Sequence, residues 1–195
     1  MSLASRAADL YYAFRFIKLL TTKWDETDAY KLGIIDADGK RIKSEKLDTS
    51  DRKAAYSSFN KLVYNLKRLL NKVPGGSSVI ASYAAAILLL REHSGMSQEA
   101  IEKVLNDCDI DTSNFINEAN EWFLLEDKQL APGIYRVRSE KLLNKTLAEE
   151  CNPKDRVRVY EQAYPIDNVF GIDVYEGVHI NTNQKIYVSL GEIYK

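Results

Sequence analysis

Acidic or hydroxyl side chains occupy every second position of a short stretch that begins at residue 107. Positions 1, 3, 5, 7 and 12 of this stretch are Asp107, Asp109, Asp111, Ser113 and Glu118. This is the ligand spacing of an EF-hand calcium loop, which makes the four carboxylates candidate metal ligands. However, Thr112 stands where the sharp turn of such a loop needs glycine. The alternative, that these residues cap helices and form turns, is therefore favoured, and no bound metal is expected.

Catalytic side chains are few, and none stands in a recognised pattern. The chain has two histidines, His93 and His179, and two cysteines, Cys108 and Cys151. No cysteine or carboxylate lies at metal-ligand spacing beside both histidines, so the sequence does not favour a zinc site. The patterns GxSxG, CxxC and HExxH do not occur. We therefore expect no cofactor and no enzymatic activity.

Basic residues recur on the polar faces of two predicted helices near the N-terminus. They are Arg15, Lys18, Lys61, Lys67 and Arg68. Tyrosines lie among them, and such rings can stack on bases. The isoelectric point of 6.2 is lower than that of a dedicated nucleic-acid-binding domain. Two partners remain open for these residues: nucleic acid, and an acidic protein surface such as residues 76–130 of a second copy.

Charge is nearly balanced over the 195 residues, with 27 basic and 28 acidic side chains, but it is unevenly distributed. Residues 1–75 have a net charge of +6, residues 76–130 of −7 and residues 131–195 of 0. The overall balance excludes a polycationic nucleic-acid-packaging protein and an acidic disordered tail. The segments of opposite sign suit contacts between proteins, or they are solvated faces of unequal charge.

Apolar residues at helical spacing predict helices along most of the first 131 residues. Three of the predicted helices cover residues 5–22, 79–93 and 113–127. Another follows the capping residues 48–51 and ends at the break at 73–76, and a further one starts at Ser97. The dipeptide Asp38-Gly39 separates two extended runs and predicts a β-hairpin over residues 31–45, because glycine tolerates the positive φ that such a turn needs.

The pattern changes after Pro132-Gly133, where apolar and polar residues begin to alternate. Strands are predicted at 134–139, 156–161, 172–180 and 185–190, with a short helix at 142–150. We therefore expect an α+β protein with two domains. Residues 1–131 would form a mostly helical domain with one β-hairpin, and residues 132–195 a small antiparallel β domain, with the boundary at 130–133.

The cellular compartment that we expect for the protein follows from three features of the sequence. The longest apolar run, Val79–Leu90, has twelve residues, fewer than the roughly 20 that span a bilayer. The N-terminus lacks the pattern of a signal peptide, and two cysteines are too few for a disulfide framework. We expect a protein of the cytosol, or of a particle assembled there, that does not contact a membrane.

Two stretches resemble uncharacterised proteins of large tailed bacteriophages. The first runs from FRFIKLLTTKWDETDAYKLGIIDADGKRIK to SFNKLVYNLKRLLNKVPGG, and the second is GIDVYEGVHINTNQKIYVSLGEI near the C-terminus. The resemblance implies a virion-associated or head-assembly protein, located in the virion and assembled in the host cytoplasm. It implies other virion proteins as partners and carries no catalytic residues over.

We therefore expect a structural or assembly protein of a tailed-phage virion that acts by protein–protein contacts and forms homo-oligomers. Segments of opposite charge suit head-to-tail contacts between copies. The alternative is a nucleic-acid-associated phage protein that uses the basic N-terminal helices.

Overall fold

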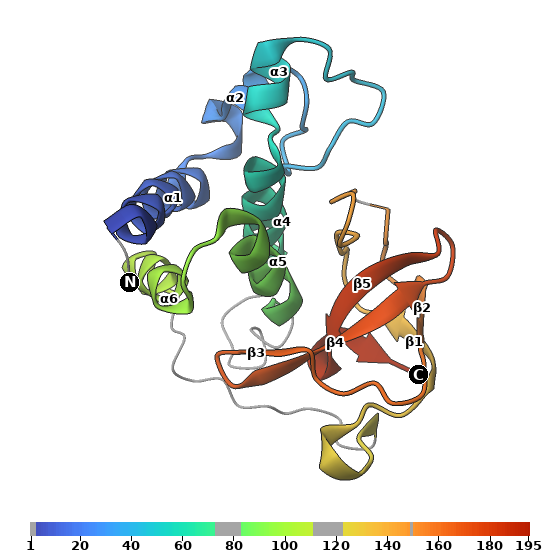
Figure 1. Ribbon diagram of the computed structural model, residues 1–195. Coiled ribbons are helices and arrows are strands. Elements are labelled where there is room, and N and C mark those ends of the chain that lie inside the picture. Colours follow the sequence, from blue (N-terminus) through green and yellow to red (C-terminus); the bar gives the residue numbers. More distant parts are fainter. Residues whose placement is uncertain (1–2, 73–82, 111–122, 149) are drawn as a thin grey trace. The chain divides into compact units, whose positions relative to one another are not determined.

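The computed structural model describes residues 3–72, 83–110, 123–148 and 150–195 (Figure 1). The chain forms two compact units. Unit 1 comprises Met1–Arg68 and Leu90–Asp111, and unit 2 comprises Leu69–Leu89 and Thr112–Lys195. Helices make up the N-terminal half and an antiparallel sheet the C-terminal part, which confirms the α+β class. The boundary at 130–133 stays a prediction, because compact units need not fold separately.

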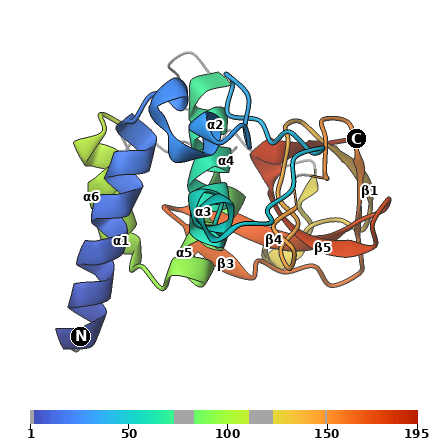
Figure 2. The ribbon, with the colours of Figure 1, turned by 90° about the horizontal axis from the view of Figure 1, so that it is seen from above.

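Helices account for most of the N-terminal half. They are α1 (Leu3–Thr21), the 3-10 turn η1 (Trp24–Glu26), α2 (Asp28–Lys31), α3 (Ser50–Ala55), α4 (Ser58–Lys72), α5 (Ala84–Ser94) and α6 (Gln98–Asp107). Helices α1 and α6 lie side by side in both views (Figures 1 and 2). Ser97 caps α6 as predicted, since its side chain accepts a hydrogen bond from the Ala100 N–H. Within the described residues, no helix is both long and apolar enough to cross a membrane.

The segment after residue 50 forms two helices, whereas the sequence predicts one. Helix α3 ends at Ala55 and α4 begins at Ser58. The Asn60 side chain donates hydrogen bonds to the carbonyl oxygens of Ala54 and Ala55, at 3.3 and 2.9 Å. The Ser57 hydroxyl accepts one from the Asn60 N–H at 3.3 Å. These bonds satisfy backbone groups at the end of one helix and the start of the next, so the break is stable.

The predicted turn at Asp38-Gly39 is present, but the pairing around it is short. The Asp36 N–H donates to the Lys40 carbonyl, and Ile35 and Arg41 form one antiparallel bridge. The segments on either side do not extend into strands. The Asp36 carboxylate accepts hydrogen bonds from the backbone N–H groups of Asp38 and Lys40, so the turn is held by a side chain as well as by the bridge.

Aromatic and aliphatic side chains fill the core of unit 1 beneath this turn. The buried cluster consists of Ala29, Ile34, Ile35, Ala55, Tyr56 and Tyr64. Trp24 packs against it, with its ring centroid 5.5 Å from that of Tyr64. Gly39 lies directly over the Trp24 ring, since a Cβ at Gly39 would come within 2.5 Å of it.

We expect Gly39→Ala to lower the free energy of unfolding by about 3 kcal/mol, through the cost of the left-handed backbone and the clash with Trp24. Gly33→Ala is the matched control, because Gly33 has a similar φ of +67° and no described atom within 4 Å of the added Cβ. It should cost only about 1 kcal/mol. Urea unfolding of both variants measures the difference, and equal losses would contradict the packing of Gly39 on Trp24.

Unit 2 contains a six-stranded antiparallel sheet. Its strands are β1 (Gly133–Val137), β2 (Arg156–Val159), β3 (Asp167–Val169), β4 (Ile172–His179), β5 (Gln184–Ser189) and β6 (Ile193–Tyr194). The order is β3-β4-β2-β1-β6, with β5 paired to β4. This confirms the four predicted strands, while β3 and β6, which have three and two residues, were not expected from the sequence.

Alternating side chains of the strands point into one apolar core. Val137, Val157, Val159, Ile186 and Val188 are all buried there. Arg156 and Arg158 alternate with the two valines of β2 and are exposed, so the strand has one buried and one exposed face. The 3-10 turn η5 (Leu190–Glu192) connects β5 to β6, and Ser189 and Glu192 form a capping box at its start.

Two predicted helices differ from the structure. Residues 142–148 and 150 form turns and irregular backbone, and Lys141 makes a β-bridge with Cys151 across them. A positive φ of 51° at Leu147 is incompatible with a continuous α-helix. Of the predicted helix 113–127, residues 113–122 lie outside the described residues. At its end, Leu124 bridges to Leu130 around the 3-10 turn η4 (Glu126–Lys128).

Buried tyrosines make the folded state less stable at alkaline pH. Burial raises the pKa of Tyr64, Tyr83 and Tyr175 to about 12. A tyrosine in the unfolded chain loses its proton near pH 10. Between about pH 10 and pH 12 the unfolded state therefore binds fewer protons than the folded state, and stability falls as the pH rises.

We expect the free energy of unfolding to decrease from about pH 10 upward, by up to about 2 kcal/mol for each buried tyrosine. Tyr175→Phe should be less stable near neutrality, because it loses the hydrogen bond to the Lys128 carbonyl, but should show a shallower alkaline decline. Urea unfolding at a series of alkaline pH values tests this, and an unchanged slope in the variant would contradict it.

Candidate functional site

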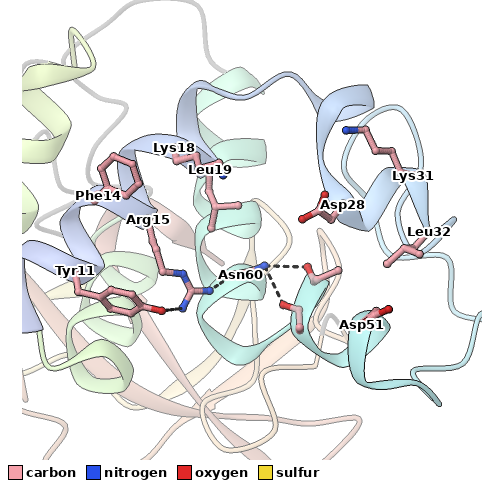
Figure 3. Close-up of a pocket in the computed structure, with 12 residues that line it drawn as sticks. Tyr11, Phe14, Arg15, Lys18, Leu19, Asp28, Lys31, Leu32, Asp51 and Asn60 are labelled. Carbon is pink, nitrogen blue, oxygen red and sulfur yellow. Dashed lines mark hydrogen bonds between the residues drawn. The ribbon is translucent and has the colours of Figure 1, made fainter.

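A surface pocket of about 710 Å³ opens in unit 1 between α1, α2, α3 and the start of α4 (Figure 3). Its lining residues are Tyr11, Phe14, Arg15, Lys18, Leu19, Asp28, Lys31, Leu32, Asp51, Ala54, Ala55 and Asn60. The set contains no cysteine, serine or histidine. The pocket offers apolar contacts, charges of both signs and one amide, and such groups can bind a partner.

Asn60 and Arg15 connect the walls of the pocket (Figure 3). The Arg15 guanidinium donates to the Asn60 side-chain oxygen at 2.9 Å, and the Asn60 amide nitrogen donates to the Ala54 and Ala55 carbonyls. A second Arg15 nitrogen donates to the Tyr11 hydroxyl at 3.5 Å. The guanidinium also lies 4.9 Å from the ring centroid of Phe59. One buried amide thus fixes α1 against the end of α3.

The rim on α1 carries large apolar side chains that face solvent. Leu10, Tyr11 and Phe14 are 74%, 58% and 70% exposed. Phe16, on the other side of the same helix, is completely buried. Neighbouring apolar side chains that stay exposed beside a concave surface are typical of a protein-contact site.

Charges of both signs line the pocket. Arg15 and Lys18 come from α1, and Lys31 comes from α2. Asp28 and Asp51 come from α2 and α3. Within the described residues, none of these side chains forms an ion pair with another. Lys18, Lys31, Asp28 and Asp51 can therefore pair with a partner. The Arg15 guanidinium is already bonded to Asn60 and Tyr11.

The five basic residues expected to contact a partner do not form one surface. Arg15 and Lys18 both line the pocket, and Lys61 is half-buried with its ammonium 5.6 Å from the Tyr56 ring centroid. Lys67 and Arg68 are only 7% and 4% exposed. They point into unit 1.

Lys67 and Arg68 bind backbone carbonyls. The Lys67 ammonium donates to the carbonyls of Leu19 and Thr22 and lies 4.3 Å from the Trp24 ring centroid. Burial lowers the pKa of this ammonium. Arg68 donates to the Gly39 carbonyl at 2.7 Å. Lys67 therefore holds the end of α1 in place, and Arg68 holds the turn at Gly39.

The acidic stretch at 107–118 is described only in part. Asp107 and Asp109 are exposed, and Asp109 has a positive φ of 60° just after α6. Asp111 and Glu118 lie outside the described residues, so the expected calcium-loop arrangement stays a prediction. The left-handed conformation of Asp109 suits the turn-forming role that the sequence favours.

A different group of metal-ligating side chains comes together in unit 2. Cys151, Asp155 and His179 bring a sulfur, a carboxylate oxygen and a ring nitrogen within 4.8 Å of one another. The sequence does not reveal this group, because His179 is 24 residues from Asp155. The signal that could have shown it is the pairing of β2 with β4, whose register places His179 opposite Val157, two residues after Asp155.

Fold and site together define an α+β protein with a pocket of mixed charge in unit 1. No family model, curated protein or solved structure matches the chain.

We expect Asn60→Ala to lower the free energy of unfolding by about 2–3 kcal/mol, because it leaves Arg15 and two helix-end carbonyls without their partner. Asn60→Asp should keep the Arg15 contact but lose both donations to the carbonyls. It should therefore fall between wild type and Asn60→Ala in urea unfolding. If Asn60→Ala matched wild type, the amide would not connect α1 to α3.

Proposed function

We propose that the chain is a structural or assembly protein of a tailed-bacteriophage virion that acts through protein–protein contacts. The observation that carries the proposal is the exposed apolar rim of α1, formed by Leu10, Tyr11 and Phe14, beside a pocket of mixed charge. The sequence resemblance to virion-associated phage proteins supports the viral setting. The place of action is the virion, assembled in the host cytoplasm.

The chemistry of the pocket suggests what kind of partner it receives. A partner that inserts an apolar side chain would cover Leu10, Phe14 and Leu19, and burial of such anchors dominates the energy of protein interfaces. Its acidic groups would pair with Lys18, and its basic groups with Asp28 or Asp51. Such a segment belongs to another virion protein or to a second copy of this chain.

Nucleic acid is less well supported as the partner. A polyanion would meet Arg15, Lys18 and Lys31, but also the carboxylates of Asp28 and Asp51 in the same lining. Burial withdraws Lys67 and Arg68 from any contact with phosphate. Because phosphate contacts supply most of the affinity for nucleic acid, the remaining exposed cations favour a protein partner.

The α1 rim gives a direct test. We expect the double variant Leu10→Ser, Phe14→Ser to reduce incorporation into virions at least about tenfold, since two anchors of an interface are worth roughly 2 kcal/mol or more. Both side chains are largely exposed, so the fold should be retained. The measurement is quantitative mass spectrometry of purified particles from a phage that carries the variant, with size determination of the isolated protein.

Ile134→Ser is the matched control, because Ile134 is 48% exposed on β1 in unit 2. It should be incorporated like wild type. Absence of the wild-type protein from particles, with salt-dependent retention on DNA that Lys18→Glu weakens, would favour the nucleic-acid alternative instead. Normal incorporation of the α1 variant would show that another surface makes the contact.

A further inference from the structure

Three side chains with metal-ligating atoms converge next to the β2–β4 pair of unit 2. The sulfur of Cys151, a carboxylate oxygen of Asp155 and a ring nitrogen of His179 all lie within 4.8 Å of one another. The group belongs to a different unit from the pocket, and the proposed function does not use it. We propose that Cys151, Asp155 and His179 bind a zinc ion.

A tight turn fixes two of the three ligands. The Asn152 N–H donates to Asp155 Oδ2 at 2.8 Å, and the Asp155 N–H donates to the Asn152 carbonyl at 3.0 Å. Lys154, inside the turn, has a φ of 74°. The backbone of Cys151 is held from the other side, since the Lys141 N–H donates to its carbonyl at 3.0 Å. The turn thereby presents the thiol and the carboxylate together.

The histidine is oriented for coordination through one nitrogen. Nε2 of His179 lies 3.2 Å from Asp155 Oδ2, and Nδ1 lies 2.9 Å from the Thr182 hydroxyl. With zinc bound at Nε2, Nδ1–H would donate to Thr182. This matches the common arrangement in which the second nitrogen of a zinc-bound histidine is hydrogen-bonded to another group. Donor atoms of a tetrahedral zinc site are about 3.2–3.8 Å apart, so the nitrogen and the oxygen already have a suitable separation.

The donor set selects the type of metal. Sulfur and imidazole nitrogen favour zinc and its neighbours among the transition metals over magnesium and calcium, which prefer oxygen ligands. On binding, the Cys151 thiol proton passes to solvent and the thiolate bonds to the ion. A water molecule would complete four-coordination, with access past the Asp155 side chain, which is 21% exposed. Nearby Lys141 is paired with Glu192, so the pair adds no net charge beside the ion.

A catalytic cysteine is a weaker interpretation of the same group. Cys151 is 1% exposed, and burial raises the pKa of its thiol to about 12. A nucleophilic cysteine needs an accessible thiolate at neutral pH. Each ring nitrogen of His179 also has another neighbour, Asp155 at Nε2 and Thr182 at Nδ1. An ion that joins the 151–155 turn to the end of β4 fits the burial of Cys151 and His179 better.

The test uses the full chain, stripped of metal with a chelator and then titrated with zinc. We expect one zinc ion per chain with a dissociation constant of about 1 µM or lower. Zinc should also raise the thermal midpoint of unfolding. Cobalt, substituted for zinc, should give the intense visible bands of a tetrahedral site and a near-ultraviolet band from sulfur-to-cobalt charge transfer.

The chain supplies its own matched controls, because it has one other cysteine and one other histidine. Cys108→Ser and His93→Gln should bind zinc like wild type. Asp155→Asn, at a partly exposed position, should stay folded and bind at least about tenfold more weakly. Cys151→Ser should abolish the cobalt–sulfur band.

Two results would overturn the proposal. One is the absence of a 1:1 zinc complex in the folded wild-type chain. The other is binding that Asp155→Asn leaves unchanged but Cys108→Ser or His93→Gln removes, which would place the ion elsewhere. Circular dichroism of each variant separates a lost ligand from a lost fold.

Discussion

Side chains of α4 bond to carbonyl groups that the short helices and loops of unit 1 leave unpaired. Asn60 binds the end of α3, Lys67 binds the end of α1, and Arg68 binds the turn at Gly39. A buried carbonyl without a donor costs about 1–3 kcal/mol. Helix α3, with six residues, is too short to be stable alone, and the hydrogen bonds from Asn60 help to hold it in position.

The hydrogen bonds from α4 side chains to distant carbonyl groups also explain which features of unit 1 the sequence predicts and which it misses. Helical periodicity locates α4, because the apolar stripe of this helix faces a core. It also locates α1, although Leu10 and Phe14, two of the apolar residues that predict this helix, face solvent. It cannot reveal that Lys67 and Arg68 turn inward, because a long basic side chain on a polar helix face has the same pattern whether it meets water or a carbonyl. The break at Tyr56 is hidden too, since it depends on Asn60 reaching back to α3.

In unit 2 the sequence predicts the strands but not their neighbours. Alternation identifies β1, β2, β4 and β5, because buried and more exposed residues alternate along most of each strand. Register and order depend on contacts between distant residues, and alternation carries no information on them. The Cys151, Asp155 and His179 group arises only when β2 pairs with β4. The two-residue strand β6 is likewise fixed by its partner β1 and not by its own residues.

Burial of the basic side chains also changes what the charge of the first 75 residues means. Their net charge of +6 suggests a cationic face, yet Lys67 and Arg68 donate hydrogen bonds to carbonyl groups inside unit 1. The cations that line the pocket share it with Asp28 and Asp51, so the local field contains both signs of charge. A uniform polyanion gains little from such a field, whereas a folded surface with its own pattern of charges can match it. The distribution of charge in space, rather than its sum along the chain, therefore favours a protein partner.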